Sequence, residues 1–180
     1  PDHPALFFLG GNKFDTKLPL VTKFIDRMDK VFIGGALSND IFKALGLPVG
    51  ISDVSEDIPD LSTVLKSSKL LIPSDVVVNS PATAPKSPRE VVAADKIMDS
   101  GLGTIEDLKK HLTGARFVLW NGPLGEYEKG FDAGTIALAH AIIESGAQSI
   151  VGGGNTLLVL EKAGLLDKFS FVSTGGGAML

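Results

Sequence analysis

The sequence predicts an α/β domain built on a parallel sheet with helices on both faces. Three observations lead to this fold class. Short runs rich in β-branched and aromatic residues recur along the chain, and most of them end directly in glycine. Segments with helical spacing lie between the runs, which is the βαβ alternation of parallel sheets. The runs are continuously apolar rather than alternating, as expected for strands buried on both faces.

Six runs are expected to form strands. The runs ALFFL, KVFI, RFVLW, SIV and FSFVST precede Gly10 and Gly11, Gly34 and Gly35, Asn121 and Gly122, Gly152 to Gly154, and Gly175 to Gly177, respectively. The remaining run, KLLIP at 69–73, ends in Pro-Ser-Asp instead of glycine. Because parallel strands share one carboxyl edge, the five glycine turns are expected to lie together at that edge.

Helices are expected between the strands. Helical spacing or a long apolar stretch is found over residues 18–28, 104–112 and 134–145. Thr104 and Asp107 stand in the places of a capping box, which predicts that the second of these helices begins at Thr104. Ser38 and Asn155 are each predicted to N-cap the helix that follows them.

Residues 75–97 interrupt this alternation. Two Val-rich runs flank a segment rich in Pro, Ser and Ala, which predicts a β-ribbon or a long excursion from the sheet. The sequence shows no internal repeat and no linker, so the 180 residues are expected to form one domain.

Composition excludes several classes of function. A net charge of −4 without blocks of like charge argues against a nucleic-acid or membrane-surface partner. No apolar run approaches the roughly 18 residues that a membrane span needs. The chain has no cysteine, which excludes disulfides and thiolate metal sites and fits a cytoplasmic location.

Both ends of the chain suggest a piece of a longer protein. The chain opens on PDHP without an initiator Met and stops three residues after TGGG. We therefore expect further sequence on each side.

The glycine turns favour an extended anionic ligand. Glycine lets the backbone approach a ligand closely, and the first turn of each following helix offers unpaired N–H groups to a phosphate. Lys13 and Lys17 stand at the start of the first helix, where a bound anion would offset their unfavourable interaction with the helix dipole. Each turn taken alone could be a simple tight turn, and each lysine a solvated side chain.

The common motifs of nucleotide and catalytic sites are absent. Neither the P-loop pattern nor G-x-G-x-x-G occurs, and the second strand ends in Gly34 and Gly35, where a dehydrogenase needs an acidic residue. The three histidines are far apart, and Ser173 has no evident base. What remains suits a reaction that depends on positioning and electrostatics, such as phosphoryl transfer.

The motifs FLGGNKFDTK, VFIGGALSNDIFKALG, LLIPSDVVV, WNGPLGEYE, IVGGGNT and STGGGAML follow one another in the chain. In this order they resemble the C-terminal, nucleotide-binding domain of phosphoglycerate kinases, over about residues 5–180. The resemblance implies a three-layer, Rossmann-like α/β/α domain whose six parallel strands have the order 3-2-1-4-5-6. It also implies that MgATP or MgADP lies at the carboxyl edge, while 3-phosphoglycerate binds a separate N-terminal domain. Residues 1–180 would then be the nucleotide-binding domain, without that N-terminal domain and without the C-terminal tail, and the full-length protein would be a cytoplasmic monomer.

The resemblance assigns roles to individual residues. The adenine and ribose would be lined by Gly10, Gly11, Gly34 and Gly35, bordered by Asn121 and Pro123, and bound through the ribose hydroxyls by Glu128. The phosphates would be held by Lys13, Lys17, Gly152, Gly153, Gly154 and Thr156, and the group in transfer would be stabilised by Thr174, Gly175, Gly176 and Gly177.

The sequence departs from the family pattern at the phosphate end. The family has Asp after the triple glycine as a magnesium contact, whereas this chain has Asn155, whose amide oxygen can bind Mg²⁺ but lacks the charge. The family usually reads GGAKVSDK, and here Asn12, Phe14 and an earlier Asp15 alter the setting of the lysines. Ala36 replaces a third glycine after the second strand.

Three functions follow from these features. The first is the nucleotide-binding half of a phosphoglycerate kinase, inactive without its other half. The second is a binding or regulatory relative that holds nucleotide with little transfer, suggested by Asn155 and the altered lysine loop. The third is a Rossmann-type oxidoreductase domain, which lacks its two best signals.

Overall fold

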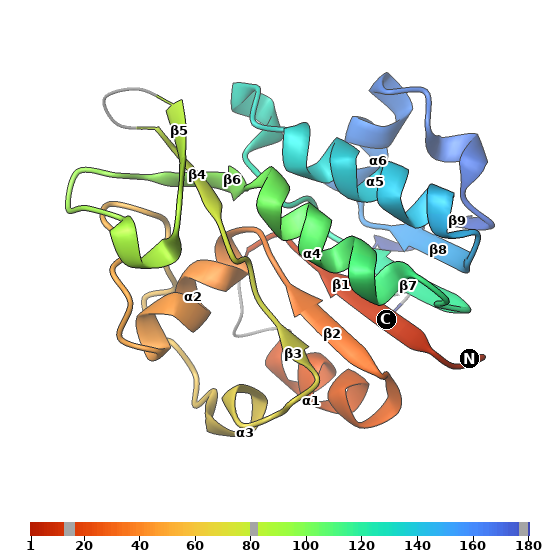
Figure 1. The fold of residues 1–180 in the computed structure, drawn as a ribbon, viewed down its shortest axis with the longest axis horizontal. Helices are drawn as coiled ribbons and strands as arrows, with labels where there is room; N and C mark the ends of the chain where they lie inside the picture. The colour runs from red at the N-terminus through yellow and green to blue at the C-terminus, as the bar shows by residue number, and fades with distance from the viewer. Residues whose placement is uncertain (13–16, 80–82, 177–179) are drawn as a thin grey trace.

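The fold is an open α/β sheet with helices on both faces (Figure 1). The computed structural model describes residues 1–12, 17–79, 83–176 and 180. The strands are β1 Ala5–Leu9, β2 Lys30–Ile33, β3 Leu70–Leu71, β4 Val76–Asn79, β5 Thr83–Lys86, β6 Ile97–Ser100, β7 Phe117–Asn121, β8 Gln148–Gly152 and β9 Phe171–Ser173. The helices are α1 Leu18–Arg27, α2 Ala36–Ala44, α3 Ser62–Leu65, α4 Leu102–Leu112, α5 Ala133–Ser145 and α6 Gly154–Lys162, with short 3-10 turns η2 Pro88–Glu90, η3 Tyr127–Lys129 and η4 Leu166–Lys168.

Six strands form one parallel sheet in the order β3-β2-β1-β7-β8-β9. Counted along the chain within this sheet, the order is 3-2-1-4-5-6, so the predicted topology is confirmed. The order reverses between β1 and β7, because the chain moves outward from β1 to β3 and later outward again from β7 to β9. This switch point is where open α/β sheets bind their ligands.

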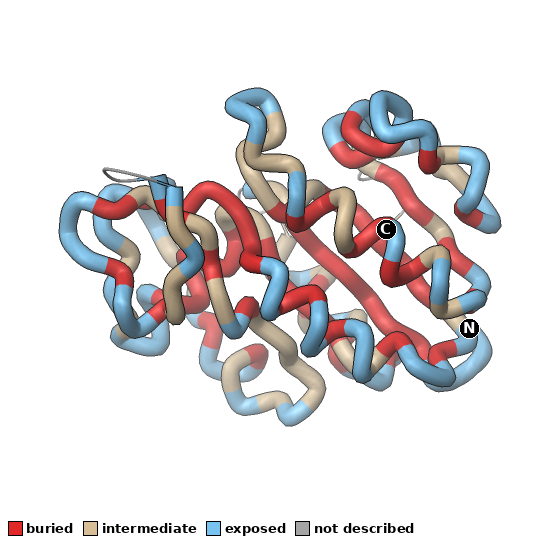
Figure 2. The backbone as a smooth tube through the Cα atoms, turned by 45° about the horizontal axis from the view of Figure 1, so that its top comes forward, coloured by how far each residue is buried: buried red, intermediate tan, exposed pale blue. Residues whose placement is uncertain are grey.

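The two faces of the sheet carry separate layers of core. Leu6 and Phe8 of β1 pack with Trp120 against α4, α5 and α6, whereas Phe7 and Leu9 point to the layer of α1, α2 and α3. Figure 2 shows that buried residues run along the central strands. Continuous apolar runs are therefore required here, since every second residue would otherwise place a polar group in a core.

Residues 75–100 form a second, three-stranded sheet in the order β5-β4-β6. The predicted excursion is confirmed, but its strands are not the two Val-rich runs: only the first run is a strand, β4, whereas β5 lies in the Pro, Ser and Ala segment and β6 follows the second run. Both pairings are antiparallel, and Val76 and Val78 of β4 pack with Ile97 of β6 and Phe42 of α2. The excursion is thus fastened to α2 beside the carboxyl edge of the main sheet.

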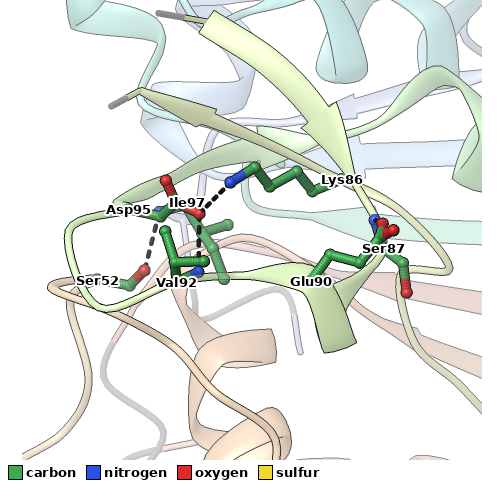
Figure 3. Close-up of polar contacts among 7 residues, drawn as sticks. All are labelled: Ser52, Lys86, Ser87, Glu90, Val92, Asp95 and Ile97. Atoms are coloured by element: carbon green, nitrogen blue, oxygen red, sulfur yellow. Dashed lines mark hydrogen bonds and ion pairs between the residues drawn. The ribbon is translucent and has the colours of Figure 1, made fainter. Parts of the chain in front are cut away.

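A buried carboxylate braces the loop between β5 and β6 (Figure 3). Asp95 is fully buried and accepts hydrogen bonds from Lys86 Nζ at 2.7 Å and from the Val92 N–H at 2.9 Å. The Lys86 hydrogen bond is the main cause that holds the pKa of Asp95 below its usual value. The Ile97 N–H donates to Ser52 Oγ at 2.8 Å, which ties the start of β6 to the segment after α2.

The predicted helices are present, but the predicted caps are wrong. Ser38 lies inside α2, which begins at Ala36, and its hydroxyl donates to the Gly35 carbonyl. α4 begins at Leu102 rather than Thr104, because the carboxylate of Asp75 accepts the N–H groups of residues 103 and 104 at 3.1 and 2.6 Å. A cap supplied by a distant residue moves the helix start away from the local signal.

α5 is nearly all apolar because it lies within the packed layer on one face of the sheet. Leu138, Ala139 and Ile142 are buried there, and His140 points to the exposed side.

Among the helices in the described ranges, none is long and apolar enough to span a membrane.

Candidate functional site

The five glycine turns lie at one edge of the main sheet, as predicted. Strand register sets Leu9 beside Ile33 and Asn121, and Gly152 lies between Asn121 and Ser173. Because the pairing is parallel, the turn after each of these residues emerges at the carboxyl edge.

The turns after β1, β2 and β7 pack directly against one another. The Gly10 N–H donates to the Asn121 carbonyl at 2.9 Å, and the Gly11 N–H donates to the Pro123 carbonyl at 3.0 Å. Gly35 has φ +61°, and a Cβ there would lie 2.6 Å from the Gly11 nitrogen. These glycines are therefore required for backbone packing, whatever ligand the edge binds.

A cavity of about 440 Å³ opens beside these turns, in the size range of ligand pockets. Five of the residues assigned by the resemblance line it: Gly11, Gly35, Pro123, Glu128 and Asn155. The other assigned residues in the described ranges do not line it: Gly10, Lys17, Gly34, Asn121, Gly152, Gly153, Gly154, Thr156, Thr174, Gly175 and Gly176.

The opposite wall of the cavity was missed by the sequence analysis. It is built from the segment after α2 and from β6 with the residue before it, and includes Asp53, Lys96, Met98 and Asp99. Glu126, which belongs to the predicted turn after β7, joins this wall. These segments are far apart in the sequence, and β6 carries no motif. Only the pairing of β6 with β4 brings them to the edge.

Lys96 ties this wall together. Its Nζ lies 2.9 Å from Glu126 and 3.0 Å from Asp53, and the hydrogen bond to Glu126 is the main cause of its raised pKa. Asp99 is 3% exposed, and burial raises the pKa of its carboxyl to about 7, although the N–H groups of Gly134 and Ser100 both donate to it. The wall thus contains a carboxyl group that can change charge near neutral pH.

Lys17 lies over the first glycine turn. Its Nζ donates to the Gly10 carbonyl at 3.2 Å, and burial lowers the pKa of its ammonium group. It immediately precedes α1, where a bound anion would offset its interaction with the helix dipole. Lys13, the other predicted lysine, lies outside the described residues.

The triple glycine turn leads into α6 differently from the prediction. The helix begins at Gly154 with Gly153 at the N-cap, so Asn155 lies within the first turn and does not cap the helix. The Asn155 amide oxygen instead accepts the Tyr127 hydroxyl at 2.9 Å. Thr156 is fully buried, and its Oγ1 accepts the Gly122 N–H at 2.9 Å, which fixes the neighbouring turn.

Two further groups complete the edge. The Nδ2 atom of Asn121 is buried without a hydrogen-bond partner among the described residues. Beyond β8, Thr174 and Gly175 are exposed after β9, and the Gly175 N–H donates to Ser173 Oγ at 3.4 Å. Gly176 is described but does not line the cavity, and Gly177 lies outside the described residues.

Together these features define a doubly wound α/β domain with a polar cavity at its topological switch point. The family model for phosphoglycerate kinase matches residues 1–180, that is, the whole chain. The chain belongs to the phosphoglycerate kinase family, which rules out the oxidoreductase domain.

Individual relatives agree with this assignment. The chain is 42% identical to a phosphoglycerate kinase of Solibacter usitatus and 39% identical to one of Acaryochloris marina. Both matches cover the whole of this chain, but only 48% of the Solibacter protein and 49% of the Acaryochloris protein. The phosphoglycerate kinase structure from Coxiella burnetii matches 99% of this chain with a TM-score of 0.91 and 36% identity, and that match covers 50% of the Coxiella chain. The structure from Pyrococcus horikoshii matches with a TM-score of 0.82 and 28% identity, over 99% of this chain and 48% of the other. The chain therefore spans about half the length of the relatives it matches.

Proposed function

We propose that this chain is the nucleotide-binding half of a phosphoglycerate kinase. In the full-length, cytoplasmic protein it would hold MgATP or MgADP during reversible phosphoryl transfer between ATP and 3-phosphoglycerate. The cavity carries this proposal, because it lies at the switch point, beside the exposed first turn of α6. The chain alone would bind nucleotide without transferring phosphate, since the phosphoglycerate would lie on the other half.

The polar groups of this edge fit the parts of a nucleotide. Glu128 is exposed on the rim and would accept hydrogen bonds from ribose hydroxyls. Asn121 would border the nucleotide from outside the cavity lining, since its buried Nδ2 has no hydrogen-bond partner among the described residues and such a donor is costly to leave unsatisfied. The exposed N–H groups at Gly154 and Asn155, with the helix dipole of α6, favour phosphate oxygens nearby.

The transferred group would be held by residues assigned from the resemblance. Lys13 and Lys17 would hold phosphate oxygens, and Lys17 would follow the group as it moves. Thr174 to Gly177 would donate to the group in transfer. Because such a transition state carries charge on its equatorial oxygens, fixed donors would stabilise it without covalent chemistry.

Magnesium fits this edge only together with the nucleotide. Among the described residues there is no group of three or more His, Asp and Glu side chains that could hold a metal ion. Asn155 offers one neutral oxygen, and Mg²⁺ commonly takes its other ligands from substrate phosphates and water. When bound, the ion neutralises charge on the phosphate oxygens.

A second candidate function is a relative that binds nucleotide with little transfer. The observation in its favour is Asn155, whose amide oxygen is neutral and already accepts the Tyr127 hydroxyl. Comparing the full-length protein with its Asn155→Asp variant in a phosphoryl-transfer assay separates the two functions. A kinase with near-full activity and little response to Asn155→Asp would rule out the impaired relative.

Calorimetric titration tests nucleotide binding by this chain directly. We expect ADP to bind with and without Mg²⁺, and Asn155→Asp to strengthen the dependence on Mg²⁺ by adding a charge. Asn79→Asp, at an exposed position at the end of β4, is the matched control for charge. If ADP binds neither the parent chain nor Asn155→Asp, both candidate functions fail.

A further inference from the structure

Two adjacent turns are joined at the cavity by a hydrogen bond between two side chains. Tyr127 begins η3 in the loop after β7, and Asn155 lies in the first turn of α6 after the neighbouring strand β8. The Tyr127 hydroxyl donates to Asn155 Oδ1 at 2.9 Å, and both residues line the cavity. The contact therefore joins the two turns at the cavity itself.

The Tyr127 hydroxyl has a second acceptor within reach. Its oxygen lies 3.2 Å from Glu128 Oε1. A phenol has a single proton, so it donates to one acceptor at a time, and the shorter distance favours Asn155. A phenol is protonated at neutral pH, so the Tyr127 hydroxyl is able to donate.

Because residue 155 is an amide and not a carboxylate, the Tyr127 contact affects how this side chain can bind a metal ion. A carboxylate has two oxygens, so one can accept a hydroxyl while the other binds a metal ion. An amide has one oxygen, and its other terminal atom is an NH₂ donor. A cation approaching Asn155 Oδ1 therefore meets the positive end of the Tyr127 O–H dipole at the same atom.

We propose that Tyr127 is a positioning residue that controls the metal contact of Asn155. Its hydroxyl competes with Mg²⁺ for the electron density of Asn155 Oδ1, so turning the hydroxyl to Glu128 strengthens the contact of that oxygen with Mg²⁺ on a bound nucleotide. This inference rests on the proposed nucleotide site. It predicts that the ribose end of the site, at Glu128, and the phosphate end, at Asn155, are coupled through one phenol.

Removing the hydroxyl tests the proposal. ADP affinity is measured by calorimetry with Mg²⁺ and with a chelator, for the parent chain, Tyr127→Phe, Asn155→Asp and the double variant. We expect Tyr127→Phe to increase the ratio of the two affinities by about 2- to 10-fold, the net worth of one hydrogen bond, through tighter binding in Mg²⁺ alone. In the Asn155→Asp background the same change should alter the ratio less than about 2-fold, because a carboxylate serves both partners.

Three outcomes would overturn the proposal. They are an equal gain with and without Mg²⁺, a loss of Mg²⁺ dependence in Tyr127→Phe, and an equal effect in both backgrounds. Absence of ADP binding in all four proteins would instead refute the nucleotide site on which the proposal rests.

A spectroscopic measurement on the parent chain keeps the test independent of the variants. Tyr127 is the only tyrosine in the sequence, so ¹³C labelling of the tyrosine ring carbon bonded to oxygen gives one signal. We expect this signal to shift on addition of MgADP and to shift less with ADP and a chelator. Identical shifts in the two conditions would show that the hydroxyl does not respond to the metal.

Discussion

Asp99 is expected to make the folded chain less stable as the pH rises through neutrality. The pKa of its carboxyl is raised by burial from 3.8 to about 7 in the folded state. Between these values the folded state binds a proton that the unfolded state has lost, so the free energy of unfolding falls with increasing pH. Protonation is favourable because the charged form is poorly solvated in the wall of the cavity.

The size of this effect follows from the two pKa values. At pH 5 the carboxyl is protonated in the folded chain and largely ionised in the unfolded chain, whereas at pH 8 it is ionised in both. The corresponding loss of stability between pH 5 and pH 8 is about 2 to 3 kcal/mol. Asp99→Asn keeps a neutral group of the same shape, so the free energy of unfolding of this variant should not show this loss between pH 5 and pH 8.

Urea unfolding at pH 5, 6, 7 and 8 measures the effect, with fluorescence of the single, fully buried Trp120 as the probe. Subtracting the Asp99→Asn curve from the parent curve removes contributions from the histidines. Asp107→Asn is the matched control, because its carboxylate is exposed and Lys110 lowers its pKa, so its contribution is lost only at acidic pH. Parallel curves for the parent chain and Asp99→Asn between pH 5 and 8 would refute the reasoning.

Three further changes test the structure around the site. Gly35→Ala should destabilise the chain by about 2 kcal/mol and abolish ADP binding, because Gly35 has φ +61° and the new Cβ would collide with the turn after β1. An unchanged free energy of unfolding in urea would contradict this. Thr156→Val, which leaves the buried Gly122 N–H without its acceptor, should cost about 1 to 3 kcal/mol in the same measurement, and no change would argue against that hydrogen bond. Lys86→Met should lower the thermal midpoint at pH 7, because it removes the cation paired with the Asp95 carboxylate. Because the pKa of Asp95 is lowered by this pairing, the difference in midpoint between the parent chain and the variant should shrink as acid protonates Asp95. A difference in midpoint that stays the same at low pH would count against the pairing.

The main sheet could be predicted because its signals are local. A strand buried on both faces must be continuously apolar, so runs such as ALFFL identify it without knowledge of its neighbours. β6, with the sequence IMDS, has no such signal, and its place depends on antiparallel pairing with β4. The start of α4 was wrong for a related reason, because its cap is Asp75, far away in the sequence.

The candidate site divides in the same way. Glycine turns could be placed at one edge because strand ends are visible in the sequence, and their positions follow from parallel pairing. Asp99 and Lys96 on the opposite wall could not be found, since their roles arise from burial and from partners on other segments. Asn155 was identified as the informative residue, but its partner Tyr127 became visible only in three dimensions.

The position of β1 in the sheet also has a consequence for how the chain folds during synthesis. Phe7 of β1 pairs with Val31 of β2 on one side and with Leu119 of β7 on the other. The ribosome synthesises β2 soon after β1, but β7 only much later. Until then β1 has an open, fully apolar edge, the kind of surface that pairs with other chains. Slow translation before β7 should therefore promote aggregation of nascent chains, and a chaperone that shields this edge should have its greatest effect in that interval.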